Sequence, residues 1–120
     1  MGIKTVAVYS EADTNSAHVS MADEAIYIGP SPASHSYLNI ENIIDAISKS
    51  GADAVHPGYG FLSENRQFAK AVERQGVTFI GPSQEAIKAM GDKIEAKTIA
   101  KESGVTTVPG YMGIIKNENE

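Results

Sequence analysis

The chain has 120 residues, of which 42% are hydrophobic and 21% charged, and its formal net charge is −5. These values are typical of one globular domain or part of one, and no basic cluster indicates a nucleic-acid partner. The absence of cysteine excludes disulfides and thiolate metal sites. No apolar run approaches the roughly 20 residues that a membrane span needs.

The first half of the chain predicts two strands and a helix. The nearly continuous apolar run at 3–10 predicts a strand buried on both faces of a parallel sheet, and 25–30 predicts a second, short strand. A helix is expected over 40–50, with isoleucines along one face. Asn39 is its expected N-cap, and Gly51 its expected end.

The second half continues the alternation of strands and helices. A short strand at 53–58 ends in the stretch "HPGYGFLSEN", and Ser63 is expected to cap the next helix, which ends at Gly76. Residues 77–82 predict a fourth strand. Two further helices follow, beginning after Ser83 and after Gly91. Strands that alternate with helices predict an α/β fold with a parallel sheet, in which ligands bind beyond the carboxyl ends of the strands.

The turn "HPGYGFLSEN" lies at such a carboxyl end. Gly58 and Gly60 allow positive φ angles and a close approach of a ligand to the backbone, and Tyr59 between them can present a flat ring and a hydroxyl. A helix that begins at Ser63 would favour a nearby anion. The alternative is an ordinary strand-to-helix turn in which residues 61–62 fill the core.

Two other side chains have both a functional and a structural interpretation. Lys93 stands at a helix start, where a cation opposes the helix dipole, and a phosphate ligand would account for its position. The alternative is a solvated face formed by Lys93, Lys97 and Lys101, which recur every four residues. His56, at a strand end, is interpreted as a packed, hydrogen-bonded histidine rather than a catalytic base.

Familiar nucleotide and metal motifs are missing from the sequence. It contains neither G-x-G-x-x-G after the first strand nor G-x-x-x-x-G-K-[ST], and its histidines lack metal-ligand spacing. Glu11 and Asp13 after the first strand leave open a flavodoxin-like or receiver-like binding module. A receiver also needs an acceptor aspartate at the end of a later strand, and none is present. A third alternative is an interaction domain that uses an exposed sheet edge.

Three segments together closely resemble the biotin carboxylase part of biotin-dependent carboxylases. They are "HPGYGFLSEN", "FIGPSQEAIKAMGDKIEAK" and "GVTTVPGYMG", and "MADEAIYIGP" and "SYLNIENIIDAI" extend the likeness upstream. The likeness covers nearly the whole chain, and its details look most like the α subunits of propionyl-CoA carboxylases. It implies a Rossmann-like, pre-ATP-grasp α/β domain.

The resemblance implies an ATP-dependent ligase that carboxylates biotin with bicarbonate, with Mg²⁺ as a further cofactor. By position, Tyr59 and Gly60 would border the biotin ring, Glu64 would support that site, and Lys93 would contact an ATP phosphate. The partners implied are a biotin carboxyl carrier domain and a carboxyltransferase β subunit, with the full-length chain a homo-oligomer. A bacterial cytoplasm and a mitochondrial matrix both fit.

The chain departs from the family at both ends. The family's first strand, its Asn-Arg-Gly-Glu turn and its first helix are expected upstream, and the glycine-rich ATP loop and metal ligands downstream. Residues 1–90 would then be a partial N-terminal domain, and 91–120 the start of a linker. Without the first strand, the sheet would have a gap of about 9.6 Å, which is two strand spacings. The 120 residues alone are expected to be inactive.

Overall fold

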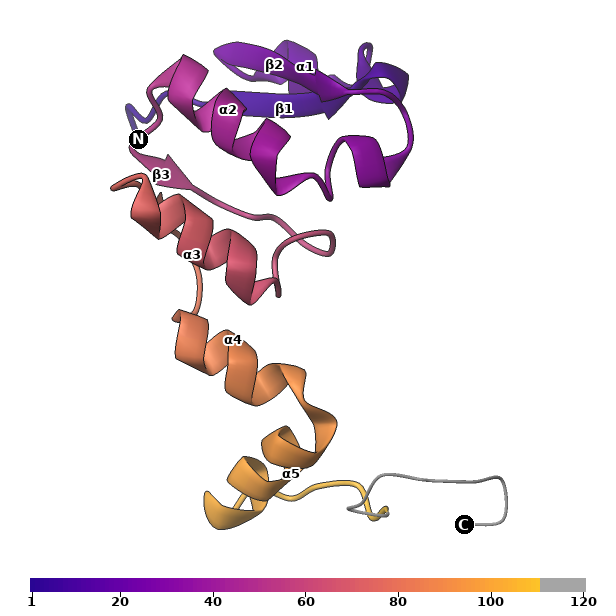
Figure 1. Cartoon of the computed structure of the whole chain (residues 1–120), viewed down its shortest axis with the longest axis vertical. Coiled ribbons are helices and arrows are strands. Elements are labelled where there is room, and N and C mark those ends of the chain that lie inside the picture. The colour runs from indigo at the N-terminus through magenta and orange to yellow at the C-terminus, as the bar shows by residue number, and fades with distance from the viewer. Residues whose placement is uncertain (111–120) are drawn as a thin grey trace. The chain divides into compact units, whose positions relative to one another are not determined.

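The computed structural model describes residues 1–110 and divides into two compact units, the first spanning Met1–Gly81 and the second beginning at Pro82 (Figure 1). The expected order of strands and helices is confirmed, with three short helical turns in addition. The elements are β1 (Val6–Ser10), η1 (Glu11–Asp13), α1 (Ala17–Met21), β2 (Glu24–Gly29), η2 (Ala33–His35), α2 (Ile40–Ser50), β3 (Ala54–Val55), α3 (Arg66–Arg74), β4 (Thr78–Phe79), α4 (Gln84–Gly91) and α5 (Lys93–Glu102).

The strands form two separate pairs. β1 pairs with β2 and β3 pairs with β4, both in parallel, so the expected parallel pairing is confirmed. A single continuous sheet is not formed within residues 1–110, because no ladder joins the two pairs there. In that part of the chain, each strand therefore has one edge without a strand partner.

The expectation that the first strand is buried on both faces is wrong. Val6 is 38% exposed, and only Ser10, at the carboxyl end of β1, is buried. β1 contacts β2, α1 and α2. The apolar run that resembles a central strand is therefore only partly covered within the described residues.

Helix α2 packs against β1, β2 and α3, and its ends are as expected. The Asn39 side chain accepts a hydrogen bond from the Asn42 N–H, and Gly51 adopts the left-handed conformation that ends the helix. The residues that α2 buries are Ile43, Ala46 and Ile47.

Helix α3 begins two residues later than expected. Asn65, not Ser63, is the N-cap, and its Oδ1 accepts a hydrogen bond from the Phe68 N–H at 2.9 Å. Phe68, Ala69 and Val72 face the core, as the sequence predicts. The Phe68 ring also meets that of Phe79 edge-on, with centroids 6.0 Å apart, and so joins α3 to β4.

The second unit contains two capped helices in contact, α4 and α5. Ser83 caps α4 as expected, because its Oγ accepts a hydrogen bond from the Ala86 N–H at 3.2 Å. Asp92 caps α5 by accepting from the Ile94 and Glu95 N–H groups. None of the helices in residues 1–110 has the length and apolar character required to traverse a bilayer.

Gly29 ends β2 at a place where a side chain does not fit. Its φ is +136°, and a Cβ atom there would lie 2.2 Å from the His35 carbonyl oxygen. The Asn42 Nδ2 holds this region together by donating to the carbonyl oxygens of Ile28 and His35, at 2.8 and 3.1 Å.

We expect Gly29→Ala to destabilise the chain by about 3 kcal/mol, because it adds backbone strain and a clash with main chain. Gly51→Ala is the matched control, since Gly51 has φ +65° but open space around its Cβ position. That control should cost about 1 kcal/mol. Urea denaturation of both variants measures the difference, and equal losses would contradict the steric argument.

Candidate functional site

The turn that follows β3 presents one tyrosine to solvent. Gly58 and Gly60 have φ angles of +69° and +74°, and Tyr59 between them is 99% exposed. His56 is also exposed, and its Nδ1 accepts a hydrogen bond from the Gly58 N–H at 3.0 Å. The hydrogen bond agrees with the structural interpretation of His56, but the expectation that this histidine is packed is wrong, because its side chain lies in solvent at the turn.

The turn is anchored immediately after Gly60. Leu62 is buried, with 6% of its surface exposed, whereas Phe61 remains 60% exposed. The expectation that 61–62 could both fill the core therefore holds only for Leu62. The Phe61 ring instead stacks on Tyr37, with centroids 4.9 Å apart and planes inclined by 25°.

Tyr37 belongs to a hydrogen-bonded cluster at the carboxyl end of β1. Its hydroxyl donates to Asp13 Oδ2 at 2.5 Å and accepts from the Ser10 N–H at 2.9 Å. Asp13 also accepts hydrogen bonds from the hydroxyls of Ser10 and Ser16. We call Ser10, Asp13 and Tyr37 the β1-end cluster.

The hydrogen bonds of the cluster shift two pKa values in opposite directions. The Tyr37 hydroxyl, followed by that of Ser10, holds the pKa of the Asp13 carboxyl below its usual 3.8. Burial, followed by the bond to Asp13, raises the pKa of Tyr37 above 10.0. Both shifts favour a charged Asp13 bound to a neutral Tyr37 hydroxyl.

The structure brings three of the four predicted site residues together. Tyr59, Gly60 and Glu64 share the turn before α3, and the Glu64 side chain is exposed. Glu64 precedes the Asn65 cap, so it lies just outside the helix rather than in its first turn.

Lys93 belongs to the second unit, at the first position of α5. It is exposed and has no ion pair within the described part of the chain. The Asp92 carboxylate occupies two N–H groups at the start of this helix. Asp92 therefore complements the helix dipole where Lys93 opposes it.

The β1-end cluster was not predicted as part of the site. The sequence indicates Asp13 only as part of a receiver-like module, and no pattern in it points to Tyr37. The available signal was a serine that ends an apolar strand and an aspartate three residues later. No local pattern indicates that Tyr37 or Phe61 joins them.

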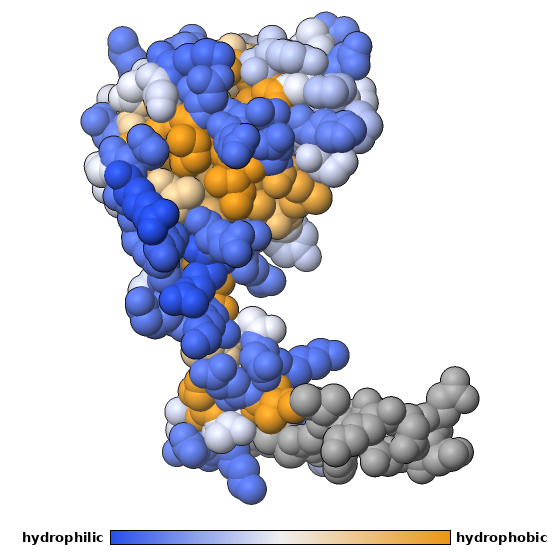
Figure 2. Space-filling model, in the orientation of Figure 1, coloured by the Kyte–Doolittle hydropathy of each residue, from blue (hydrophilic) through white to orange (hydrophobic). Residues whose placement is uncertain are grey.

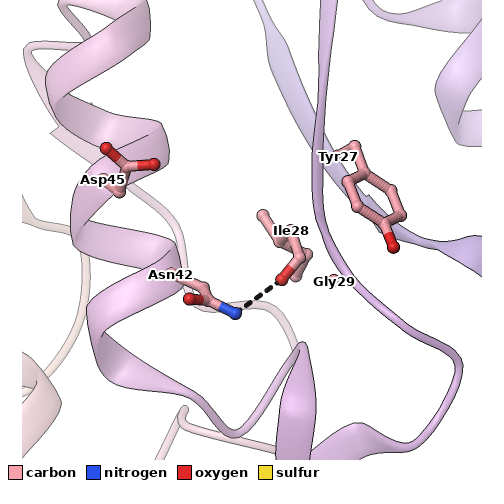
Figure 3. Close-up of a pocket in the computed structure, with 5 residues that line it drawn as sticks. All are labelled: Tyr27, Ile28, Gly29, Asn42 and Asp45. Carbon is pink, nitrogen blue, oxygen red and sulfur yellow. Dashed lines mark hydrogen bonds between the residues drawn. The ribbon is translucent and has the colours of Figure 1, made fainter.

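Two shallow hollows lie on the first unit. One, of about 220 Å³, lies between β2 and α2 (Figure 3), where Asn42 points to the Ile28 carbonyl and Tyr27 lies on the other side of the strand. The other, of about 440 Å³, lies between α2 and α3, where apolar side chains are visible in Figure 2. Its apolar lining residues are Ile40, Ile44 and Ala71. Neither hollow includes a predicted site residue.

Comparison with known proteins identifies relatives along the whole chain. The family described as "Biotin carboxylase, N-terminal domain" matches residues 1–87. The propionyl-CoA carboxylase alpha chain of Ruegeria pomeroyi is 60% identical over all 120 residues, and the mitochondrial one of Rattus norvegicus is 58% identical. The chain spans only 18% and 16% of these two relatives.

A solved structure of similar fold is the biotin carboxylase domain dimer of the Hydrogenobacter thermophilus 2-oxoglutarate carboxylase, in complex with MgADP, ADP and bicarbonate. Its TM-score is 0.89 and its identity 51%, over 98% of this chain and 26% of that one. These matches favour the resemblance to biotin carboxylases over a receiver-like module or an interaction domain.

The pKa of Asp13 provides a test of the β1-end cluster. Because hydrogen bonds to the charged carboxylate lower this pKa in the folded chain, they stabilise the fold above pH 3.8, and the stabilisation is lost as pH falls through the lower folded value. In Tyr37→Phe, the pKa should rise towards 3.8, as a carboxyl ¹³C NMR titration would report. Asp23, whose pKa is lowered by bonds to Thr5, is the internal control. An unchanged Asp13 titration in the variant would count against the cluster.

Proposed function

Because this chain belongs to the biotin carboxylase N-terminal domain family, we propose that it forms part of a longer enzyme that carboxylates biotin with ATP and bicarbonate. The observation that carries the proposal is the 60% identity to a propionyl-CoA carboxylase alpha chain over all 120 residues. Propionyl-CoA carboxylase is accordingly the enzyme we favour. The acyl-CoA would be selected by the carboxyltransferase partner.

The turn after β3 fits the approach of a flat ring. Tyr59 is fully exposed between two glycines of positive φ, so its ring and the backbone of Gly60 are both accessible. We propose that Tyr59 and Gly60 border the biotin ureido ring and that Glu64, exposed on the same turn, supports this site.

Lys93 fits a phosphate contact through its side chain alone. It is exposed, and the Asp92 carboxylate already binds N–H groups of the α5 terminus. We propose that the Lys93 ammonium contacts an ATP phosphate. The MgADP in the Hydrogenobacter relative supports nucleotide binding by the longer protein.

The described residues do not fit a magnesium site. Within residues 1–110, no group of three or more histidine, aspartate or glutamate side chains is arranged to hold a metal ion. We place the Mg²⁺ ligands in the longer protein, outside this chain.

The unpaired edges of β1 and β3 support a further element of the proposal. Each strand has a partner on one side only within the described residues. We propose that the first strand of the family domain, followed by its Asn-Arg-Gly-Glu turn and helix, belongs between them. In this division, residues 1–90 are a partial N-terminal domain and 91–120 the start of the linker to the ATP-grasp domain.

The partners and compartment follow from the relatives. We propose that the longer protein acts with a biotin carboxyl carrier domain and a carboxyltransferase β subunit, and that it forms a homo-oligomer. The Hydrogenobacter domain is a dimer, which supports the last point. The rat relative is mitochondrial, so we propose the mitochondrial matrix for a eukaryotic source and the cytoplasm for a bacterial one.

A chimera tests the proposed function directly. Residues 1–120 would replace the matching segment of the Ruegeria pomeroyi alpha chain, and ADP release would be measured with free biotin and bicarbonate. We expect turnover within about tenfold of the parent chain, which serves as the control. The isolated 120 residues should show none. A folded but inactive chimera, or sustained turnover by the isolated chain, would refute the proposal.

Substitutions in the chimera test the turn. Tyr59→Ala should raise KM for biotin roughly threefold to tenfold, since an aromatic contact contributes about 0.5–1.5 kcal/mol. Tyr59→Phe should raise it less, because it keeps the ring. KM for ATP should not change in either variant. Equal effects on both substrates would argue against a biotin contact.

A lysine pair on α5 tests the phosphate contact. Lys93→Ala should raise KM for ATP about tenfold or more, because a hydrogen bond to a charged group contributes about 1.5–3 kcal/mol. Lys101→Ala is the matched control, since Lys101 is an exposed lysine on the same helix. If both variants change KM alike, the solvated-face interpretation is correct.

A further inference from the structure

Phe61 adopts an unfavourable backbone conformation next to the candidate site. Its φ is +43°, and within residues 1–110 it is the only residue other than glycine with a positive φ. A left-handed phenylalanine is strained and persists only where its surroundings hold it. The position is therefore set by contacts rather than by local preference.

One contact that holds Phe61 is the stack on Tyr37, from the loop between β2 and α2. This stack leaves Phe61 60% exposed, so burial alone does not account for it. Tyr37 is itself fixed through its hydroxyl, which binds Asp13 and the Ser10 backbone. Ser10 is 1% exposed, so the anchor point lies in the buried end of β1.

The backbone after Phe61 is also anchored, because the next residue, Leu62, is buried. The Ser63 N–H also closes the turn by donating to the Gly60 carbonyl at 2.9 Å. Before Phe61, in contrast, Gly58 and Gly60 flank an exposed Tyr59. Glycines allow many backbone conformations, so the direction of Tyr59 depends on what holds the turn at its two ends: the Gly58–His56 hydrogen bond before it and Phe61 after it.

We infer that Tyr37 and Phe61 form a clamp that positions Tyr59 and Gly60 relative to the carboxyl end of β1. Tyr37 and Phe61 are positioning residues in this inference, and neither needs to touch the substrate. The expected consequence of the clamp, a correctly shaped biotin site, rests on the proposed function. The clamp itself depends only on contacts within the first unit.

Three variants separate the clamp from ordinary packing. Tyr37→Phe keeps the ring that stacks on Phe61 but removes the hydrogen bonds to Asp13 and Ser10. Phe61→Gly removes the ring but suits the left-handed conformation, so it loses the clamp while relieving strain. Phe61→Tyr keeps the stack and should behave as the unsubstituted chain. Tyr27→Phe is the control, because it removes a hydroxyl from a tyrosine that is 52% exposed and meets Tyr9 edge-on rather than Phe61.

The first experiment uses the 120-residue chain and NMR. Ring-current shifts of the Tyr37 ring protons report the stack, and amide exchange of residues 58–63 reports the turn. We expect Tyr37→Phe and Phe61→Gly to speed that exchange about tenfold, with exchange in α2 unchanged. Unchanged exchange in both variants would overturn the clamp, and so would an equal change with Tyr27→Phe.

The second experiment uses the chimera described above. Tyr37→Phe and Phe61→Gly should raise KM for biotin about fivefold and leave KM for ATP within twofold. Phe61→Tyr should leave both KM values at those of the unsubstituted chimera. Faster exchange without a change in KM for biotin would overturn the positioning role. An inactive unsubstituted chimera would refute the proposed function, and the NMR result would still decide the clamp.

Discussion

Burial of the apolar face of α2 is the constraint on which the first unit depends. No strand in residues 1–110 joins the β1–β2 pair to the β3–β4 pair, so hydrogen bonds between strands do not hold the two halves together there. Helix α2 contacts β1 and β2 and also packs on α3, which in turn contacts β4. Full burial of an aliphatic side chain contributes about 1.5–3 kcal/mol. The α2–α3 contact therefore holds the two strand pairs together, as a continuous sheet does in a typical parallel α/β domain.

In this arrangement, the contacts of Tyr37 join the carboxyl end of β1 to the turn that follows β3. The loop after β2 carries Tyr37 to the end of β1, and the turn after β3 places Phe61 on the same ring. The Tyr37 hydroxyl makes the polar contacts, and its ring makes the aromatic one. A solvent-exposed tyrosine can thus be presented from a turn whose base is fixed, which is how binding residues on loops are commonly held.

The proposed function assigns only part of a biotin carboxylase site to this chain. The turn offers an exposed ring and accessible backbone, whereas a metal cluster is missing from residues 1–110. The chain also spans less than a fifth of the propionyl-CoA carboxylase alpha chains that it resembles. We therefore interpret the segment as one wall of a composite site, with its chemistry shared among parts of a longer protein.

The sequence by itself determined the order of elements, most helix ends and the family. Caps such as Asn39 and Ser83 depend on groups three residues apart, so local spacing predicts them. The motif around Tyr59 and Gly60 indicated both the position of the turn and its relatives. The two flanking glycines also indicated that the Tyr59 ring could be presented to a ligand.

Only the tertiary structure decided which of two nearby capping residues begins α3, how the strands divide into pairs, and what holds the turn. Ser63 and Asn65 are both good caps, but the N–H groups of Ser63 and Asn65 close turns onto the Gly60 and Leu62 carbonyls, so the helix begins after Asn65. The Tyr37–Phe61 stack joins segments that are distant in the chain. The strained φ of Phe61 is stable only after these segments meet. Local preferences predict interactions within a few residues, whereas these contacts depend on how separate elements pack.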